Sequence, residues 1–438
     1  MKREIYKNLL EWKNKSTRKP LILEGARQVG KTYILQEFGR NEYDNMIYIN
    51  CHNNSFMKEL FSIDFDMDRI LLGLSAYSEQ RIIIGKTLIF LDEIQEIPNG
   101  LASLKYFCEN AKEQHVVVAG SLLGISNIEH ESYPVGKVDT LKLYPMSFAE
   151  FLDAMGKKEL LNIIQTLDWL LIQTLDEKLK ELLRQYYFVG GMPEAVSYYA
   201  ENKDIITIRQ IQKEILNAYS RDFAKHAGNE TQRIRQVWES VPAQLARENK
   251  KFIFGAIKKG ARANDFEKAI QWLIEAGLVY KVERNTEPRV PLKFYADKEA
   301  FKMYLLDVGL FGAMAETPPR EMLIGDNVFS EFKGAFTENF VLEQMVTIED
   351  LPIYYYSKDN SSQELDFIIQ TNSKVTPVEV KAEENVKAKS LSTYINYDQK
   401  QYNLKGVRFS MKPFVDQGWM ENVPLYAVKS YIQSLQIE

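Results

Sequence analysis

The chain has few of the residues that build disulfide frameworks or zinc sites. Its two cysteines, Cys51 and Cys108, cannot form a disulfide framework and are typical of a reducing compartment. The four histidines are scattered without ligand spacing, so we expect no zinc site. No stretch approaches about 18 uncharged apolar residues, and the first residues lack a signal-peptide core. We therefore expect no membrane span and a cytoplasmic location.

An excess of positive charge is also lacking. Against 55 Lys and Arg there are 60 Asp and Glu, which gives a formal net charge of −5. A bulk basic field for nucleic acid is therefore excluded, whereas a local basic face remains open. The length of 438 residues is typical of two to three domains, and 45% hydrophobic residues supply more than one core.

The most informative segment is a glycine-rich loop that ends in Lys31 and Thr32. It follows the apolar run Leu21–Leu23 and precedes a helical pattern, and this order of strand, loop and helix is typical of a phosphate-binding loop. We expect its backbone N–H groups and the helix N-terminus to bind a triphosphate. Lys31 would reach the β- and γ-phosphates, and the Thr32 hydroxyl would ligate Mg²⁺. The nucleotide-binding residues that we predict are Gly25, Ala26, Arg27, Gln28, Val29, Gly30, Lys31, Thr32 and Tyr33.

Short apolar runs alternate with helical patterns over the first 125 residues, which indicates an α/β fold with a parallel sheet and helices on both faces. We predict strands at Leu21–Leu23, Met46–Ile49, Thr87–Leu91 and His115–Ala119. Residues 150–225 have a helical pattern. Two strands after further helices, Gly277–Val282 and Leu292–Tyr295, resemble a winged helix, and a plain α+β packing module is an equal alternative. A helix and the strands Ile353–Tyr356, Leu365–Gln370 and Val375–Val380 indicate a separate C-terminal α/β module.

Two carboxylates complete the predicted nucleotide site. Asp92 and Glu93 end the apolar run Thr87–Leu91 about sixty residues after Lys31. We expect Asp92 to hold Mg²⁺ opposite Thr32, and Glu93 to orient and polarise the attacking water. The alternative is a solvated strand end. Ser121, after the next strand, is a candidate for sensing the γ-phosphate or holding the water, and the alternative is a helix cap.

These motifs together resemble one family, the predicted bacterial and archaeal AAA-type ATPases with a C-terminal restriction-endonuclease-like domain of uncharacterised function. The resemblance is carried by Gly25–Thr32, Leu91–Gln95, Ala119–Ser121, Leu143–Phe151, Gly190–Pro193 and Tyr304–Leu310. It implies ATP binding and hydrolysis and allows an oligomer. Where many members have Gly-Arg, this chain has Gly136-Lys137, and a lysine offers phosphate only a point charge. Arg221 is a candidate replacement, with a helix salt bridge as the alternative.

Four domains follow from the patterns and the resemblance. We expect an AAA-type ATPase core at 1–155, a helical extension at 156–225, a winged-helix-like domain at 226–325 and a restriction-endonuclease-like domain at 326–438.

A second constellation lies in the C-terminal module. Glu338 lies on a helical pattern, Asp366 on a strand, and Glu379 and Lys381 two residues apart on the next strand, where they face the same side. This layout resembles the restriction-endonuclease-like superfamily, in which Asp366 and Glu379 would bind Mg²⁺ and Lys381 would polarise a water or the scissile phosphate. The alternatives are a cross-strand ion pair that faces water, or a degenerate DNA-binding or regulatory module.

Three functions are compatible with the sequence. The first is an Mg-dependent ATPase, with Lys31, Glu93 and Ser121 as catalytic residues, that is coupled to a C-terminal nuclease-like or DNA-interacting module. The second is a nucleotide-gated binding protein with negligible hydrolysis. The third is an ATP-licensed, metal-dependent DNA nuclease that uses Glu338, Asp366, Glu379 and Lys381. ATP and Mg²⁺ are the expected cofactors, and DNA is a candidate partner.

Overall fold

The computed structural model describes residues 1–120, 134–247, 250–324, 333–358, 363–382 and 388–437. The chain divides into two compact units. The N-terminal unit comprises residues 2–144 and 275–278, and the C-terminal unit comprises residues 145–274 and 279–438 together with Met1. The first boundary falls at 144/145, eleven residues before the end that the sequence predicts for the ATPase core.

The N-terminal unit contains a parallel sheet of five strands in the order β2-β3-β4-β1-β5. The strands are β1 (Leu21–Glu24), β2 (Asn45–Asn50), β3 (Thr87–Asp92), β4 (His115–Ala119) and β5 (Asp139–Lys142). The first four match the predicted strands to within one residue at each end. Strands β1, β3 and β4 are buried on both faces, and they read as continuous apolar runs for that reason. The expected α/β fold is confirmed.

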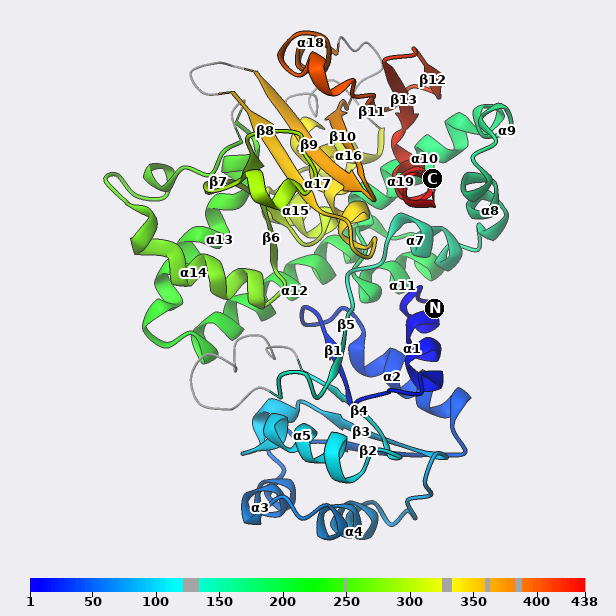
Figure 1. Cartoon of the computed structure of the whole chain (residues 1–438), viewed down its shortest axis with the longest axis vertical. Helices are drawn as coiled ribbons and strands as arrows, with labels where there is room; N and C mark the ends of the chain where they lie inside the picture. The colour runs from blue at the N-terminus through cyan, green and yellow to red at the C-terminus, as the bar shows by residue number, and fades with distance from the viewer. Residues whose placement is uncertain (121–133, 248–249, 325–332, 359–362, 383–387, 438) are drawn as a thin grey trace. The chain divides into compact units, whose positions relative to one another are not determined.

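Helices cover both faces of this sheet (Figure 1). On one face, Ile89 and Leu91 of β3 belong to an apolar core with side chains of three helices, α3 (Ser55–Ile63), α4 (Met67–Ser78) and α5 (Gly100–Asn110). Leu88 of β3 points to the other face, where an added Cβ at Gly39 of α2 (Lys31–Glu42) would lie 3.2 Å from it. Helix α1 (Ile5–Asn14) packs against α2.

The C-terminal unit begins with a block of helices, as its Leu-, Glu- and Lys-rich sequence predicts. They are α7 (Phe148–Ala154), α8 (Lys158–Thr166), α9 (Trp169–Thr174), α10 (Asp176–Val189), α11 (Pro193–Asn202), α12 (Ile205–His226), α13 (Thr231–Leu245) and α14 (Ala263–Glu275). The glycine pair after α10 lets two segments approach closely. Gly190 has φ +75°, and an added Cβ there would lie 2.3 Å from Asp307 Oδ1. The Gly191 N–H donates to Asp307 Oδ2 at 2.5 Å.

A mixed sheet of eight strands forms the rest of this unit, in the order β12-β13-β11-β10-β9-β8-β6-β7. The strands are β6 (Val279–Asn285), β7 (Ala296–Leu305), β8 (Ile353–Ser357), β9 (Glu364–Thr371), β10 (Lys374–Val380), β11 (Gly406–Ser410), β12 (Val415–Asp416) and β13 (Met420–Pro424). The helices around them are α15 (Val308–Met314), α16 (Pro319–Ile324), α17 (Lys333–Val346), α18 (Lys389–Thr393) and α19 (Val428–Ile437). Figure 1 shows this sheet in yellow-green to red.

The hairpin β6–β7 belongs to this sheet, because Arg284 of β6 pairs in parallel with Tyr355 of β8. The sheet therefore continues across the boundary that the sequence predicts at 325/326. The winged-helix-like assignment stays a prediction.

The strand predicted at Leu292–Tyr295 is wrong, because these residues form a 3-10 helix. The backbone N–H and carbonyl of Leu292, which would pair with a neighbouring strand in a sheet, are hydrogen-bonded to side chains instead. Asn285 Nδ2 donates to the Leu292 carbonyl at 2.8 Å, and the Leu292 N–H donates to Gln370 Oε1 at 2.9 Å. The strand begins only at Ala296.

Candidate functional site

The glycine-rich loop connects β1 to the N-terminus of α2, as expected. Gly25 has φ +144°, and an added Cβ would lie 2.2 Å from the Leu143 carbonyl oxygen, so only glycine fits. Gly30, at φ +96°, precedes the first turn of α2 without a side-chain cap. The N–H groups of that turn are left for a ligand, and the helix dipole favours an anion there. Arg27, Gln28 and Tyr33 are exposed around the loop, whereas Ala26 and Val29 are buried.

Lys31 lies folded against the loop. Its Nζ donates to the carbonyl oxygens of Gly25 at 2.7 Å and Ala26 at 2.8 Å. Burial lowers the pKa of Lys31 to about 8, and the carboxylates of Glu93 and Asp92 oppose this shift. The ammonium group therefore lies in a desolvated position where an anionic ligand would be strongly favoured.

Thr32 and Asp92 meet at the carboxyl end of the sheet, where Thr32 Oγ1 donates to Asp92 Oδ2 at 2.8 Å. Tyr48 of β2 donates to the same carboxylate oxygen at 3.3 Å. Burial raises the pKa of Asp92, and the Thr32 hydrogen bond opposes the rise. A hydroxyl and a carboxylate held together are hard oxygen ligands of the kind that Mg²⁺ prefers, so these residues fit the expected metal.

Glu93 follows directly, in the left-handed backbone region at φ +53°. Its Oε2 accepts a hydrogen bond from Gln95 Nε2 at 2.6 Å. The carboxylate is half-buried and adjoins Asp92, whose Oδ1 accepts from the Glu93 N–H at 3.2 Å. Sequence reasoning found Glu93 but missed Gln95, although Gln95 stands only two residues away.

Strand β4 lies between β1 and β3, and its last residue, Ala119, pairs with both Leu23 and Asp92. The candidate Ser121 lies outside the described residues.

Arg3 supports the loop from the N-terminal segment, and sequence reasoning missed it. Its guanidinium donates to the Val29 carbonyl at 2.9 Å and to the Tyr144 carbonyl at 2.6 Å, and the side chain is buried. Arg3 stands 26 positions before Val29, so no short sequence motif could have indicated this contact.

The two basic residues considered for γ-phosphate contact have different surroundings. Lys137 forms an ion pair with Glu109 of α5 at 2.8 Å. Arg221 lies exposed on α12 in the other unit. Neither the ion pair of Lys137 nor the exposed position of Arg221 identifies a phosphate-binding residue.

The C-terminal quartet comes together around α17 and two strands. Lys381 Nζ forms an ion pair with Glu379 Oε1 at 2.9 Å, as expected for residues two apart. Asp366 Oδ2 accepts from the Val380 N–H at 2.7 Å, and its side chain hydrogen-bonds to Glu338. Glu379 Oε2 is buried without a hydrogen-bond partner among the described residues.

Lysines that the sequence did not single out neutralise this cluster. Lys250 forms an ion pair with Glu338, and the fully buried Lys302 forms one with Glu364. Tyr304 donates to Glu338 Oε2 at 3.3 Å. The structure thus places three lysines, counting Lys381, among the carboxylates.

Burial and neighbouring charges shift the pKa values of Asp366 and Glu338 in opposite directions. Burial raises the pKa of Asp366 to about 7, and the Glu338 carboxylate adds to the rise. Burial alone would raise the pKa of Glu338, but the Lys250 and Lys302 ammonium groups lower it. Two neighbouring carboxyls whose pKa values are shifted apart occur at catalytic sites and also in structural ion-pair networks.

In the described ranges, no group of three or more His, Cys, Asp and Glu side chains is arranged to hold a metal ion. Across the same ranges, no helix is both long and apolar enough to cross a bilayer.

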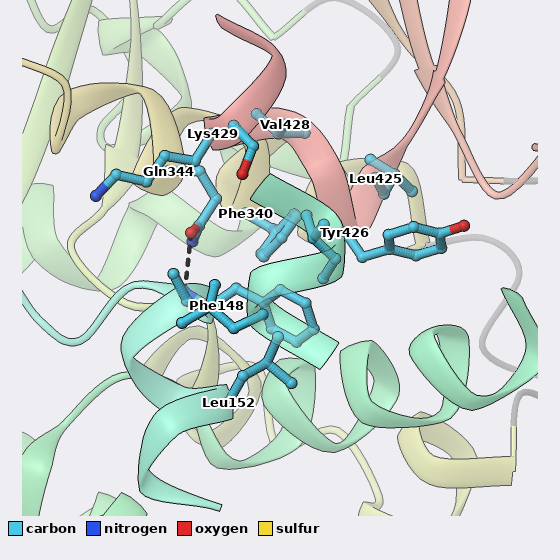
Figure 2. A pocket seen from close by; sticks show the side chains of 12 residues that line it. Phe148, Leu152, Phe340, Gln344, Leu425, Tyr426, Val428 and Lys429 are labelled. Carbon is cyan, nitrogen blue, oxygen red and sulfur yellow. Dashed lines mark hydrogen bonds between the residues drawn. The ribbon is translucent and has the colours of Figure 1, made fainter. Parts of the chain in front are cut away.

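A small pocket in the C-terminal unit lies between α7, α8, α17 and α19 (Figure 2). Aromatic and aliphatic side chains line most of it, including Phe148, Leu152 and Phe340, and Gln344 Oε1 accepts from the Phe148 N–H at 2.9 Å. Lys429 is its single charged lining residue. The pocket lacks the convergent acids or bases that catalysis needs.

Three family models match successive parts of the chain. Residues 17–152 match an AAA domain, residues 180–321 match a domain of unknown function (DUF8612), and residues 333–427 match another (DUF4143). A search of curated proteins found no match. The first match identifies the segment that carries the glycine-rich loop, Asp92 and Glu93 as an AAA-type P-loop domain.

A search of solved structures found weakly similar chains. The Walker-type ATPase PABY2304 of Pyrococcus abyssi is 16% identical with a TM-score of 0.43, and the match covers 72% of this chain and 95% of that one. The Aeropyrum pernix ORC1 protein, solved in complex with DNA, is 13% identical with a TM-score of 0.28, over 72% and 91%. The Thermotoga maritima RuvB Holliday junction branch migration motor is 14% identical with a TM-score of 0.29, over 67% and 91%. Since these TM-scores are low, nothing further rests on them.

Proposed function

We propose that the N-terminal unit binds ATP with Mg²⁺ and hydrolyses it to ADP and phosphate, and that the nucleotide cycle acts on the C-terminal unit. The observation that carries the proposal is the Thr32–Asp92 hydrogen bond of 2.8 Å, because it joins the two motifs at one edge of the sheet. Glu93 stands immediately beside this pair. The match of residues 17–152 to an AAA domain supports the same chemistry.

Each residue has a distinct role in this proposal. The loop N–H groups and the start of α2 bind phosphate oxygens, and Lys31 neutralises their charge. Thr32 and Asp92 hold Mg²⁺, which offsets phosphate charge when bound. Glu93 orients the attacking water and accepts its proton. Lys31 exchanges its hydrogen bonds to the Gly25 and Ala26 carbonyl oxygens for phosphate oxygens when ATP binds.

A phosphate-release assay tests the proposal on the wild-type protein, Lys31→Ala and Glu93→Gln. We expect both variants to lose nearly all release, while Glu93→Gln still binds ATP. Lys86→Ala and Glu79→Gln are matched controls, because both residues are exposed in the same unit. Equal release from the wild type and Lys31→Ala would overturn hydrolysis. Retained ATP binding in that case would favour the nucleotide-gated binding protein.

A metal-dependent nuclease in the C-terminal unit is a second candidate. It is favoured by the gathering of Glu338, Asp366, Glu379 and Lys381, and by the buried, unpartnered Glu379 Oε2. The order of helix, three strands, helix and strand from α17 to β11 is compatible with a restriction-endonuclease-like domain. The ion pair of Lys250 with Glu338 counts against it, because an ammonium group neutralises a carboxylate that the reaction would use.

Cleavage of single-stranded, duplex and branched DNA in Mg²⁺ or Mn²⁺, with and without ATP, tests this candidate. Asp366→Asn should abolish cleavage, and Asp350→Asn, at an exposed position of the same unit, should not. Absence of cleavage by the wild-type protein on every substrate would exclude the nuclease and leave a DNA-binding or regulatory role for the module. Cleavage that survives Asp366→Asn would exclude this site.

A further inference from the structure

Gln95 stands beside the proposed catalytic glutamate in a fixed orientation. Its Nε2 donates to Glu93 Oε2 at 2.6 Å. Because a carboxylate can only accept hydrogen bonds, the amide nitrogen must face Glu93, and the amide oxygen must point the other way. The orientation of Gln95 is therefore set by chemistry and is not an arbitrary assignment.

The amide oxygen of Gln95 is unpaired within the described part of the chain. Oε1 is buried and has no hydrogen-bond partner among the residues that the structure describes. A buried acceptor left unpaired costs stability, and such groups are rare in native structures. The unpaired oxygen is thus a cost of having glutamine at this position, and the hydrogen bond to Glu93 is the contact that the glutamine adds.

The turn that carries Gln95 is rigid. Glu93 is in the left-handed region at φ +53°, and a 3-10 helix, Ile94–Glu96, follows it. Ile94 and Ile97 are buried, and an added Cβ at Gly100 would lie 2.5 Å from the Ile94 carbonyl oxygen. Strained backbone that is held by close packing persists at sites where side-chain placement matters. The backbone that carries Gln95 is thus closely packed on both sides of this residue.

We propose that Gln95 is a positioning residue for ATP hydrolysis, which holds the Glu93 carboxylate in place through the hydrogen bond from Nε2 to Oε2. The inference rests on the proposed ATPase function. Glu93 takes one proton of the water, the water oxygen bonds to the γ-phosphorus, and the bond to the β–γ bridging oxygen breaks. The products are ADP and inorganic phosphate. Gln95 exchanges no proton and stabilises the geometry in which this transfer occurs.

Steady-state hydrolysis by the full chain tests the inference with Gln95→Met, which keeps the length of the side chain and removes both amide groups. We expect kcat to fall about tenfold to a hundredfold, with KM for ATP and the affinity for a fluorescent ATP analogue unchanged. Gln80→Met, at an exposed glutamine of the same unit, is the matched control and should keep the wild-type kcat. Combining Glu93→Gln with Gln95→Met should cost no more than Glu93→Gln alone, because Gln95 acts through Glu93.

The pH dependence of kcat in Gln95→Glu distinguishes a positioning role of Gln95 from a purely structural one. The new carboxyl would face Glu93, and two carboxylates at this distance hold one proton between them. The donor to Glu93 is then present only while that proton is bound. We expect kcat of Gln95→Glu to be low at alkaline pH and to recover toward acidic pH, with a profile displaced from that of the wild type.

The outcomes separate the inference from the function on which it rests. A wild type no faster than Lys31→Ala overturns the ATPase proposal and this inference with it. A fast wild type with an unaffected Gln95→Met overturns the inference alone. A parallel fall of kcat, nucleotide affinity and thermal stability in Gln95→Met, with an undisplaced Gln95→Glu profile, also overturns it, because that pattern belongs to a structural glutamine.

Discussion

Thr32 and Asp92 are sixty residues apart in the chain, and their side chains share a hydrogen bond of 2.8 Å. The contact arises because β1 and β3 are parallel and end at the same edge of the sheet. Tyr48 donates to the same Asp92 oxygen from the neighbouring strand β2. Two oxygen groups are therefore already placed for a hard cation before any ligand is considered.

Thr32→Val should raise the Mg²⁺ concentration that half-saturates hydrolysis, because the branched shape remains and the hydroxyl is lost. We expect a shift of about tenfold or more, the scale found when a group that supports a metal is removed. Thr32→Ser keeps the hydroxyl and should stay close to the wild type. Titration of phosphate release with Mg²⁺ at fixed ATP measures the shift. Equal Mg²⁺ requirements for the Val and Ser variants would contradict the assignment of Thr32.

ATP affinity should fall as the pH rises through about 8. Burial lowers the pKa of Lys31 to about 8 from 10.5, so the ammonium group loses its proton in the free protein above that pH. Only the protonated form neutralises phosphate, and bound phosphate raises the pKa again. Between about pH 8 and 10.5, ATP binding should therefore take up a proton.

Calorimetry in two buffers of different ionisation enthalpy measures that proton uptake. Lys31→Met is the matched control and should bind more weakly, without the pH dependence above pH 8. An ATP affinity of the wild type that stays constant from pH 7 to pH 9.5 would contradict the shifted pKa of Lys31.

Gly25→Ala should damage the loop more than an ordinary glycine substitution. The residue has φ +144°, and its new Cβ would lie 2.2 Å from the Leu143 carbonyl oxygen. Gly85→Ala is the comparison, because Gly85 also has a positive φ, of +70°, but has nothing within 4 Å of an added Cβ. We expect about 1 kcal/mol of destabilisation for Gly85→Ala and about 2–3 kcal/mol for Gly25→Ala, with loss of ATP binding in the latter alone. Urea unfolding and analogue binding measure both; equal effects would show that the Leu143 contact is unimportant.

The sequence was most informative where local pattern and burial coincide. The strands β1 and β3 read as apolar runs because both faces are covered. The edge strand β5, Asp139–Lys142, alternates half-buried and exposed residues and gave no such signal. Its place beside β1 depends on pairing that no short window contains.

The site residues also fall into two groups, those that a local motif identifies and those that only the folded structure brings to the site. Lys31 and Asp92 belong to recognisable motifs, whereas Arg3 reaches the Val29 carbonyl across 26 positions and has no motif. Gln95 was adjacent to a motif, yet its role depends on which way its amide points, which is a property of the folded turn. Lys302 and its carboxylate partners are long-range contacts of the same kind.

Lys302→Met should destabilise the C-terminal unit strongly. The side chain is fully buried, pairs with Glu364 and lies 4.9 Å from the centre of the Tyr355 ring. Burial alone would lower the pKa of Lys302, but the carboxylates of Glu364 and Glu338 raise it above its usual value. Removing one partner of a buried ion pair leaves uncompensated charge and costs about 3–5 kcal/mol.

Urea unfolding of the full chain, followed by tryptophan fluorescence, measures the loss for Lys302→Met. Lys298→Met is the matched control on the same strand, because Lys298 is exposed, and it should change the free energy of unfolding by less than about 0.5 kcal/mol. Lys302→Met combined with Glu364→Gln should recover part of the loss, because the second change removes the unpaired carboxylate. A Lys302→Met protein as stable as the wild type would mean that the carboxylates of this cluster are protonated in the folded state, and that Lys302 does not neutralise them.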